Sequence, residues 1–338
     1  MSSGVVRISL VVCATALLFA SVANGASLLT PYNVIVQGDF QSTADVGGGI
    51  AVGGELSFSG SYALVDALNG EPISAFGTNS PTLVVAGSVS SGANLQPGAG
   101  NYYVPVGTSV TPAPSGCCTN LRTTPGLTTS PVNFASQFST FDTESQTFSN
   151  DATTGTPKSP IVNNTIELDV SQGGLNVFDI NYATLESATQ IDIKLSNGAT
   201  FSADGTYGTG NAYVVINVVG GTSAAPISVN LSNWHGTSLN GATCDSNTCW
   251  WAQDVLYNFY EVNSLTVSGK MTGSVLAPWA AVTGTAGQME GSLIAQSFTG
   301  QWEFHNFDFM GGTPEPAPFA VVGLGLLGLA YFRKRRRA

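Results

Sequence analysis

Charged side chains are scarce in this sequence, and so are the residues that most often carry catalysis. Lysine, arginine, aspartate and glutamate make up 9% of the 338 residues, and only two histidines are present. His235 and His305 lie seventy residues apart, and no H-E-x-x-H, G-x-S-x-G or P-loop motif occurs. The sequence therefore gives no support to a zinc protease, a serine hydrolase with a nucleophile elbow, or a nucleotide-binding enzyme.

Basic residues are the rarest charged class between the two ends of the chain. Residues 26–313 contain twenty acidic side chains and four basic ones, Arg122, Lys158, Lys194 and Lys270. Such a negative surface repels nucleic acid and anionic lipid, so neither is expected as a partner of this region. Glycine, serine, threonine, asparagine and valine are abundant instead, and this composition favours strands and turns over surface helices.

The N-terminus carries one of the two long apolar runs of the chain. Arg7 precedes an apolar stretch from Ile8 to Phe19, and small residues follow it. This order is typical of a secretory signal peptide, which we expect to occupy residues 1–25 with cleavage after Gly25. The protein is thus predicted to be exported.

The C-terminus combines three elements in a fixed order. The tripeptide Pro314, Glu315 and Pro316 precedes an apolar stretch over residues 317–332 and a basic cluster over residues 333–338. The apolar stretch would span about 24 Å as a helix, slightly less than a hydrocarbon core, with the cations in the cytoplasm. Together these elements resemble the PEP-CTERM sorting signal of Gram-negative bacteria. The resemblance implies transient anchoring in the inner membrane and cleavage by an exosortase; an ordinary C-terminal anchor is the alternative.

Four cysteines follow the predicted signal peptide, an even number that is compatible with disulfides in an exported protein. Cys244 and Cys249 would close a short polar loop, C-D-S-N-T-C, and form the candidate disulfide. Cys117 and Cys118 are adjacent and cannot easily bond to each other, so longer-range pairing stays open. The spacing includes no adjacent histidine, so no metal site is predicted, and we expect no cofactor.

Short apolar runs bounded by glycine dominate the body and predict strands. Early examples are Y-N-V-I-V-Q-G-D-F from Tyr32, G-G-I-A-V-G-G-E-L from Gly48 and T-L-V-V-A-G-S-V-S from Thr82. Each run is too short for a helix and contains β-branched residues. Later, residues 166–170 and 191–195 alternate apolar and charged side chains, which places the carboxylates of Glu167, Asp169 and Asp192 on a solvated face. Residues 213–219 are apolar almost throughout and predict a central strand.

Some of these runs recur at nearly constant steps. Val36 and Val52 are sixteen residues apart, and G-S-V-L-A-P at Gly273 is repeated as G-S-L-I-A-Q at Gly291 after eighteen. Repeats of this length predict the coils of a β-solenoid with a continuous apolar core. Because the repeats are irregular, a β-sandwich is the alternative.

The middle of the body differs from this pattern. Residues 98–131 are rich in proline, threonine, serine and glycine without periodicity, so we expect a loop or an insertion there. Four phenylalanines then follow at offsets of four, seven and fourteen: Phe134, Phe138, Phe141 and Phe148. These offsets predict one amphipathic helix over residues 131–149, docked on the β core by its aromatic face.

Three tryptophans surround the candidate disulfide loop: Trp234, Trp250 and Trp251. If they are exposed, they would form a flat apolar platform suited to sugar rings or protein partners. Packing beneath the loop as local core is the alternative. We expect His305 to be a hydrogen-bonded structural residue.

Segments at both ends of the body resemble the choice-of-anchor A family of bacterial adhesins. They are Y-N-V-I-V-Q-G-D-F-Q-S-T-A-D-V-G-G-G-I-A-V-G-G-E-L over residues 32–56, and the segments over residues 256–282 and 289–307. The resemblance implies a link to ice-binding-like and collagen-binding-like solenoid domains, but it identifies no ligand. The loop around Cys244 departs from the family pattern. The resemblance therefore does not establish that this protein shares a binding surface with the family.

The sequence thus predicts an exported, exosortase-processed protein of a Gram-negative cell envelope. Its expected role is that of a non-catalytic adhesin or binding protein, with exopolysaccharide or a matrix protein as partner. A β-solenoid enzyme that acts on polysaccharide is the alternative, because acidic residues are plentiful and paired carboxylates can cleave glycosidic bonds.

Overall fold

The structure, a computed structural model, describes the β-rich body of the chain. The described residues are 32–59, 61–64, 81–90, 94–98, 100–108, 110, 121–122, 127–158, 161–201, 211–244 and 249–311. The predicted signal peptide, the sorting signal from Pro314 onward, and Cys117 and Cys118 lie outside them. Within the described ranges, no helix is both long and apolar enough to cross a membrane.

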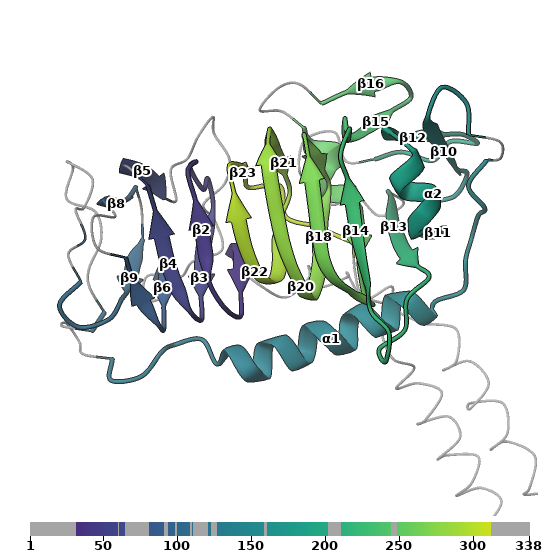
Figure 1. Cartoon of the computed structure of the whole chain (residues 1–338). Coiled ribbons are helices and arrows are strands. Elements are labelled where there is room, and N and C mark those ends of the chain that lie inside the picture. The colour runs from purple at the N-terminus through teal and green to yellow at the C-terminus, as the bar shows by residue number, and fades with distance from the viewer. Residues whose placement is uncertain are drawn as a thin grey trace, which may run out of the picture.

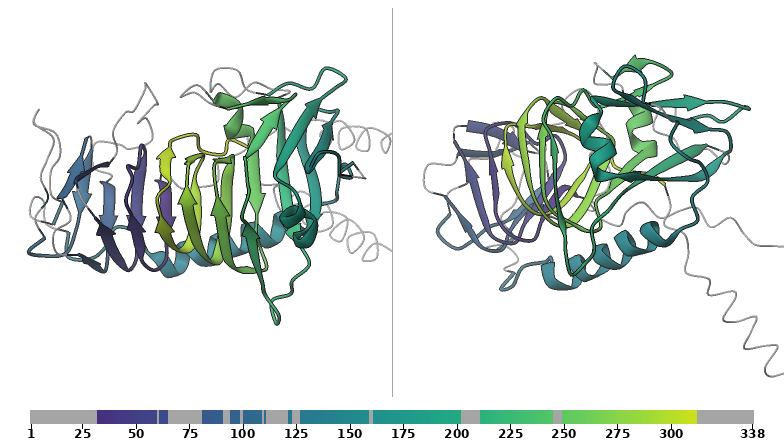
Figure 2. Two further views of the ribbon diagram at one scale, coloured as in Figure 1. Left: turned by 45° about the horizontal axis from the view of Figure 1, so that its top comes forward. Right: turned by 45° about the vertical axis from the view of Figure 1, so that its right-hand side comes forward.

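The body is a β-solenoid in which parallel strands stack along one axis, as the sequence predicted (Figures 1 and 2). A full coil passes over three sides, which we call faces A, B and C. Face A is the longest sheet. Its strands stack in the order β11 (Gly174–Asn181), β13 (Ala212–Val219), β17 (Val255–Asn258), the first part of β20 (Ser274–Ala286), the first part of β22 (Leu293–Gly300), β1 (Tyr32–Val36), β3 (Gly49–Val52), β6 (Pro81–Val85) and β9 (Asn101–Tyr103).

Faces B and C complete the coils. Face B stacks β14 (Ile227–Leu231), β18 (Val262–Ser268), the second parts of β20 and β22, β2 (Phe40–Ser42), β4 (Glu55–Phe58) and β7 (Ser88–Val89). Face C consists of three shorter sheets. They are β10 (Thr165–Val170), β12 (Gln190–Leu195), β15 (Thr237–Leu239) and β16 (Ala242–Thr243); β19 (Met271–Thr272), β21 (Gln288–Glu290) and β23 (Glu303–His305); and β5 (Ser61–Leu64) with β8 (Asn94–Pro97).

The coils do not stack in the order of the sequence. Strand β1 pairs in parallel with β22, so Val34 lies beside Leu293, and the early coils continue the stack beyond the last coil (Figure 1). Strands of the middle segment, from β10 to β18, form the other end of the stack. The first coil of the described body therefore pairs with its last coil within the solenoid.

The repeats in the sequence correspond to pairs of neighbouring coils. Val36 pairs with Val52 across β1 and β3, and Val275 pairs with Leu293 across β20 and β22. Gly273 and Gly291 start this second pair of strands with positive φ values of 113° and 152°. A Cβ atom on Gly291 would lie 2.6 Å from the carbonyl carbon and oxygen of Gly273, so the stacked turns require glycine.

Two features differ from the sequence prediction. Residues 98–131 are not wholly a loop, because β9 lies within them and pairs with β6 at the end of face A. A short helix, α2 (Tyr182–Ser187), follows β11 where other coils have a strand of face B. Its N-cap is Asn181, whose side chain accepts a hydrogen bond from the backbone N–H of Ala183.

Strand β13 lies between β11 and β17, which confirms the predicted central strand.

Helix α1 (Phe134–Asn150) is the predicted amphipathic helix and runs along the outside of face A (Figure 1). Asn133 caps its N-terminus by accepting a hydrogen bond from Ser136 N–H. Three of the four phenylalanines are fully buried against outward side chains of face A: Phe138, Phe141 and Phe148. Burial of each ring contributes roughly 1.5–3 kcal/mol, which is enough to hold a helix that has little propensity of its own.

Candidate functional site

A ladder of asparagines fixes the position of α1 on face A. Asn258 Nδ2 donates to Ser145 O at 2.8 Å and to Asn217 Oδ1 at 2.9 Å, while Ser145 Oγ donates to Asn258 Oδ1 at 2.6 Å. Asn217 Nδ2 in turn donates to Phe148 O at 2.9 Å and to Asp179 Oδ1 at 3.0 Å. Buried hydrogen bonds of this kind admit one register, so the polar side of the helix is presented at a defined place beside the solenoid.

An interruption of the repeat lies where faces A and B meet on β20. Ala277 pairs with Ala295 and Ala281 with Ser297, so four residue steps on β20 oppose two on β22. The two extra residues form a bulge that contains Trp279. A bulge re-aims the side chain that it carries, and Trp279 is 49% exposed, whereas the flanking Pro278 and Ala280 are buried.

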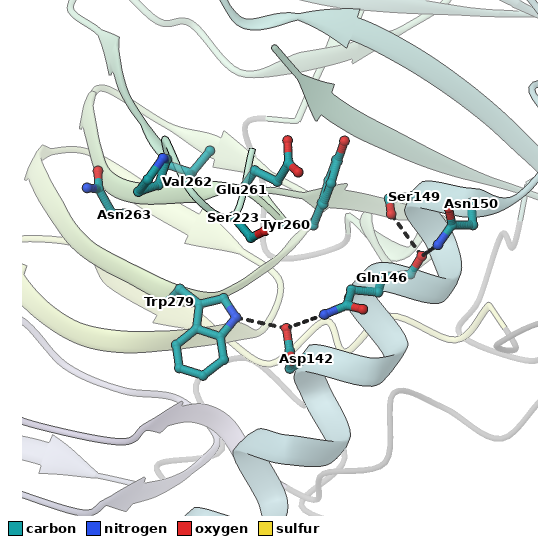
Figure 3. A pocket seen from close by; sticks show the side chains of 11 residues that line it. Asp142, Gln146, Ser149, Asn150, Ser223, Tyr260, Glu261, Val262, Asn263 and Trp279 are labelled. Atoms are coloured by element: carbon teal, nitrogen blue, oxygen red, sulfur yellow. Dashed lines mark hydrogen bonds between the residues drawn. The ribbon is translucent and has the colours of Figure 1, made fainter. Parts of the chain in front are cut away.

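Trp279 forms one end of a cleft between α1 and the solenoid (Figure 3). The cleft has a volume of about 620 Å³. Helix α1 supplies one wall with Asp142, Gln146, Ser149 and Asn150. The turns that lead into β14 and β18, together with the first two residues of β18, supply the other wall with Ser223, Pro226, Tyr260, Glu261, Val262 and Asn263.

Asp142 connects the α1 wall to Trp279 at the end of the cleft. Its Oδ1 atom accepts a hydrogen bond of 2.8 Å from Trp279 Nε1 and one of 3.1 Å from Gln146 Nε2 (Figure 3). The hydrogen bond from Nε1, at the edge of the ring, therefore orients the indole, and it does not involve the two apolar faces of the ring. An oriented aromatic ring beside amides and carboxylates is suited to a ligand that has both apolar and hydroxyl-bearing surfaces.

The cleft has a negative electrostatic character. Its lining includes two carboxylates, Asp142 and Glu261, and no lysine, arginine or histidine within the described residues. Burial, together with the nearby carboxylates of Glu261 and Asp179, raises the pKa of the Tyr260 hydroxyl. Negative charge in a ligand is thus disfavoured here.

Face B presents rows of uncharged polar side chains to the outside. Thr283 on β20 pairs with Thr266 on β18 and with Thr299 on β22, and these side chains alternate with buried apolar residues. The same row continues to Asn230 on one side and to Gln41 and Ser57 on the other. Neighbouring strands are about 4.8 Å apart, so this row repeats with that spacing.

The candidate disulfide and its tryptophans form a small buried cluster. Cys244 and Cys249 lie at disulfide distance, with Cα atoms 5.8 Å apart, and contact Ala252 and Phe307. Trp250 and Trp251 are half-buried against this cluster, and Trp250 packs edge-on against Phe307 with a centroid distance of 5.5 Å.

Trp234 does not join them on a surface. It is 1% exposed and packs edge-on against Tyr257 in the main core. The three tryptophans therefore form no common exposed platform, and the alternative of local packing describes them better. Trp234 is buried because it belongs to the main core cluster, where Tyr257 of β17 packs against it.

The candidate carboxylates have structural partners. Glu167 and Asp169 both pair with Lys158, the latter at 3.2 Å. Asp192 was expected on a solvated face but is 7% exposed, because the turn between β15 and β16 reaches its carboxylate, where Gly241 N–H donates to Oδ1 at 2.8 Å. Burial opposes its ionisation, but the pair with Lys194 and hydrogen bonds from Gly241 and Ser238 hold the pKa of Asp192 below its usual value.

His305 is a structural residue, as expected. It is 4% exposed, and its Nδ1 lies 2.9 Å from Glu290 Oε2. Lys270 lies 3.7 Å from the other oxygen of Glu290, so this buried carboxylate is held between two basic groups on face C. No three potential metal ligands cluster in the part of the chain that the structure describes.

The sequence contains a signal for Trp279 in the unequal lengths of the two repeats. Both repeats begin with G-S and reach a T-G pair, but Gly284 follows Gly273 by eleven residues, whereas Gly300 follows Gly291 by nine. The longer copy includes the inserted tryptophan. An insertion of an aromatic residue into one coil of a solenoid indicates a side chain outside the repeating core.

Comparison with known families agrees with this architecture. A family model described as "Putative Ice-binding-like adhesive domain" matches residues 25–306, which is most of the chain. No curated protein and no solved structure matches the chain. An adhesive domain acts by binding at the cell surface or outside the cell, and it points away from catalysis. The chain belongs to this family of ice-binding-like adhesive domains.

Proposed function

We propose that this protein is an exported, non-catalytic adhesin that binds exopolysaccharide in the cleft beside Trp279. The observation that carries the proposal is the exposed indole, held by Asp142 at the end of a polar cleft. The apolar face of a pyranose ring stacks on an indole, and its hydroxyls can bind Gln146, Asn150 and Asn263, which line the same cleft.

The export and processing steps belong to the same proposal. The N-terminal run up to Gly25 supports secretion, and Pro314, Glu315 and Pro316, with the apolar and basic segments behind them, support cleavage by an exosortase. The resemblance to choice-of-anchor A adhesins is consistent with such a tail. The Cys244–Cys249 pair fits an oxidising compartment outside the cytoplasm. In this proposal the processed body stays in the polysaccharide-rich envelope of a Gram-negative cell.

Binding is tested on the exported protein with extracellular polysaccharides, with released reducing ends measured in the same samples. We expect saturable binding without new reducing ends, and Trp279→Ala to weaken it roughly tenfold. Val106→Ala is the matched control, because Val106 is also a large exposed apolar residue but lies outside the cleft. Accumulating oligosaccharide would favour the solenoid enzyme instead, with Asp142 and Glu261 as its carboxylates; binding that ignores Trp279 would contradict the proposed site.

A second candidate function rests on face B. Threonines in register at about 4.8 Å intervals form a flat, uncharged and regular surface, and the family to which the chain belongs is described as ice-binding-like. We propose ice as the alternative ligand of this face. Thermal hysteresis that Thr283→Tyr abolishes and Thr143→Tyr, on the exposed side of α1, leaves unchanged would support it. Absence of hysteresis in the unaltered protein would exclude it.

A further inference from the structure

We propose that the cleft beside Trp279 selects polysaccharides that carry free amino groups, such as de-N-acetylated polyglucosamine. This inference rests on the proposed polysaccharide-binding function and specifies its ligand class. The inference is drawn from the negative charge of the cleft, whereas the proposed function requires no charge on the cleft or on its ligand.

The carboxylates stand on opposite walls of the cleft. Asp142 comes from α1, and Glu261 comes from the turn into β18 (Figure 3). The Oδ1 atom of Asp142 accepts the hydrogen bonds from Trp279 and Gln146, and neither bond involves its second oxygen. An ammonium group bound in the cleft would be attracted by Asp142 and by the face of the indole. Glu261 would attract it at longer range, because its carboxylate lies beside the Tyr260 hydroxyl and points away from Asp142 (Figure 3).

Basic side chains do not neutralise this charge. Residues 26–313 contain four basic side chains, and three of them pair with carboxylates elsewhere. Lys158 pairs with Glu167 and Asp169, Lys194 with Asp192, and Lys270 with Glu290. The guanidinium of Arg122 lies 4.4 Å from the centroid of the Tyr103 ring. None of the four lines the cleft. The raised pKa of the Tyr260 hydroxyl, due to burial and then to Glu261 and Asp179, reports the same field.

The charge separates three classes of polysaccharide. A polyuronate or sulfated chain would be repelled, and a neutral chain would gain stacking on Trp279 without ionic attraction. A chain with free amines gains both. A lysine-rich peptide shares the positive charge, but it offers no pyranose ring for the indole and no hydroxyls for Gln146, Asn150 and Asn263.

The experiment uses the full chain as it is exported and four probes: glucosamine oligomers, their N-acetylated counterparts, a polyuronate and oligolysine. We expect the free-amine oligomer to bind at least tenfold more tightly than the acetylated one, and salt to reduce this preference. Raising the pH until the sugar amine is neutral should remove the preference without any substitution. Glu261→Gln should reduce the preference for the free-amine oligomer, whereas Trp279→Ala should weaken binding of both oligomers.

The outcomes distinguish this inference from the proposed function. Equal, Trp279-dependent binding of acetylated and free-amine oligomers would overturn the amine selectivity but leave the adhesin proposal standing. Preference for the polyuronate, or tighter binding of oligolysine than of any sugar, would also overturn the inference. No binding of any sugar, together with no binding of native exopolysaccharide, would contradict both.

Discussion

Trp279 Nε1 donates a hydrogen bond of 2.8 Å to Asp142 Oδ1 and so connects a bulge of the solenoid to helix α1. The two residues are 137 positions apart in the chain. Neither belongs to a recognisable motif, and only the docking of α1 on face A brings them together. The contact makes Asp142 a positioning residue for the indole that we assign to ligand binding.

Replacing Asp142 should weaken binding without unfolding the protein. Asp142→Ala removes the acceptor of the indole N–H, and a hydrogen bond of this kind contributes about 1 kcal/mol, so we expect a roughly fivefold loss of polysaccharide affinity. Asp142→Asn keeps an acceptor oxygen and should lose less. Calorimetric titration measures both, and Thr143→Ala on the adjacent, exposed position of α1 is the control. Equal affinity of Asp142→Ala and the unaltered protein would refute the positioning role.

Replacing Asn258 should detach α1 from face A. Asn258→Ala leaves buried hydrogen-bonding groups of Ser145 and Asn217 without their partner, which costs about 2–4 kcal/mol in free energy of unfolding. We expect lower stability to denaturant and faster amide hydrogen exchange along α1. Asn230→Ala, on the exposed side of β14, should change stability by less than about 0.5 kcal/mol. If both variants lose the same stability, the asparagine ladder does not hold the helix.

Glu144 should make stability depend on pH. It lies on the buried side of α1, where its side chain is 9% exposed, and its Oε2 has no hydrogen-bond partner among the described residues. Burial raises the pKa of Glu144 to about 7. The folded state therefore binds a proton more tightly than the unfolded state. Stability is then greatest below the ordinary glutamate pKa and falls as the pH rises to about 7, by about 3 kcal/mol.

Glu144→Gln tests this dependence by unfolding at a series of pH values. We expect the variant to be more stable than the unaltered protein at pH 8 and to lose part of the decline between about pH 4.5 and 7. Asp308 contributes in the same direction, because burial raises its pKa to about 6, so part of the decline should persist. Glu55→Gln, at an exposed position of β4, is the control. An unchanged pH profile in Glu144→Gln would show that the carboxylate is not buried in the folded protein.

Gly291 should tolerate no side chain. Gly291→Ala would place Cβ 2.6 Å from the backbone of Gly273 and also strain a φ of 152°, so we expect a loss of at least about 2 kcal/mol. Gly198 also has a positive φ, 83°, but a Cβ atom there meets no other atom within 4 Å. Gly198→Ala should therefore cost only about 1 kcal/mol. Thermal unfolding of the two variants separates backbone strain from the contact between coils.

Local sequence determined the building units of this protein. Short apolar runs bounded by glycine predicted the strands, the steps of sixteen and eighteen predicted neighbouring coils, and the phenylalanine offsets predicted α1. These predictions succeeded because the side-chain direction repeats every two residues in a strand and every 3.6 in a helix. The same signals are present in any segment that buries one face, whatever covers it.

Only the tertiary structure decided what lies on each face and in which order the coils stack. Parallel pairing of β1 with β22 joins residues about 260 positions apart, and no local spacing specifies such a partner. Alternation likewise placed Asp192 on an outer face, but the turn between β15 and β16 donates a hydrogen bond to its carboxylate and buries it. Trp234 and Trp279 show the same limit: one indole is enclosed by later strands and the other is exposed by a bulge. Burial depends on segments that pack from elsewhere in the chain, so the cleft beside Trp279 exists only once α1 and the solenoid are assembled.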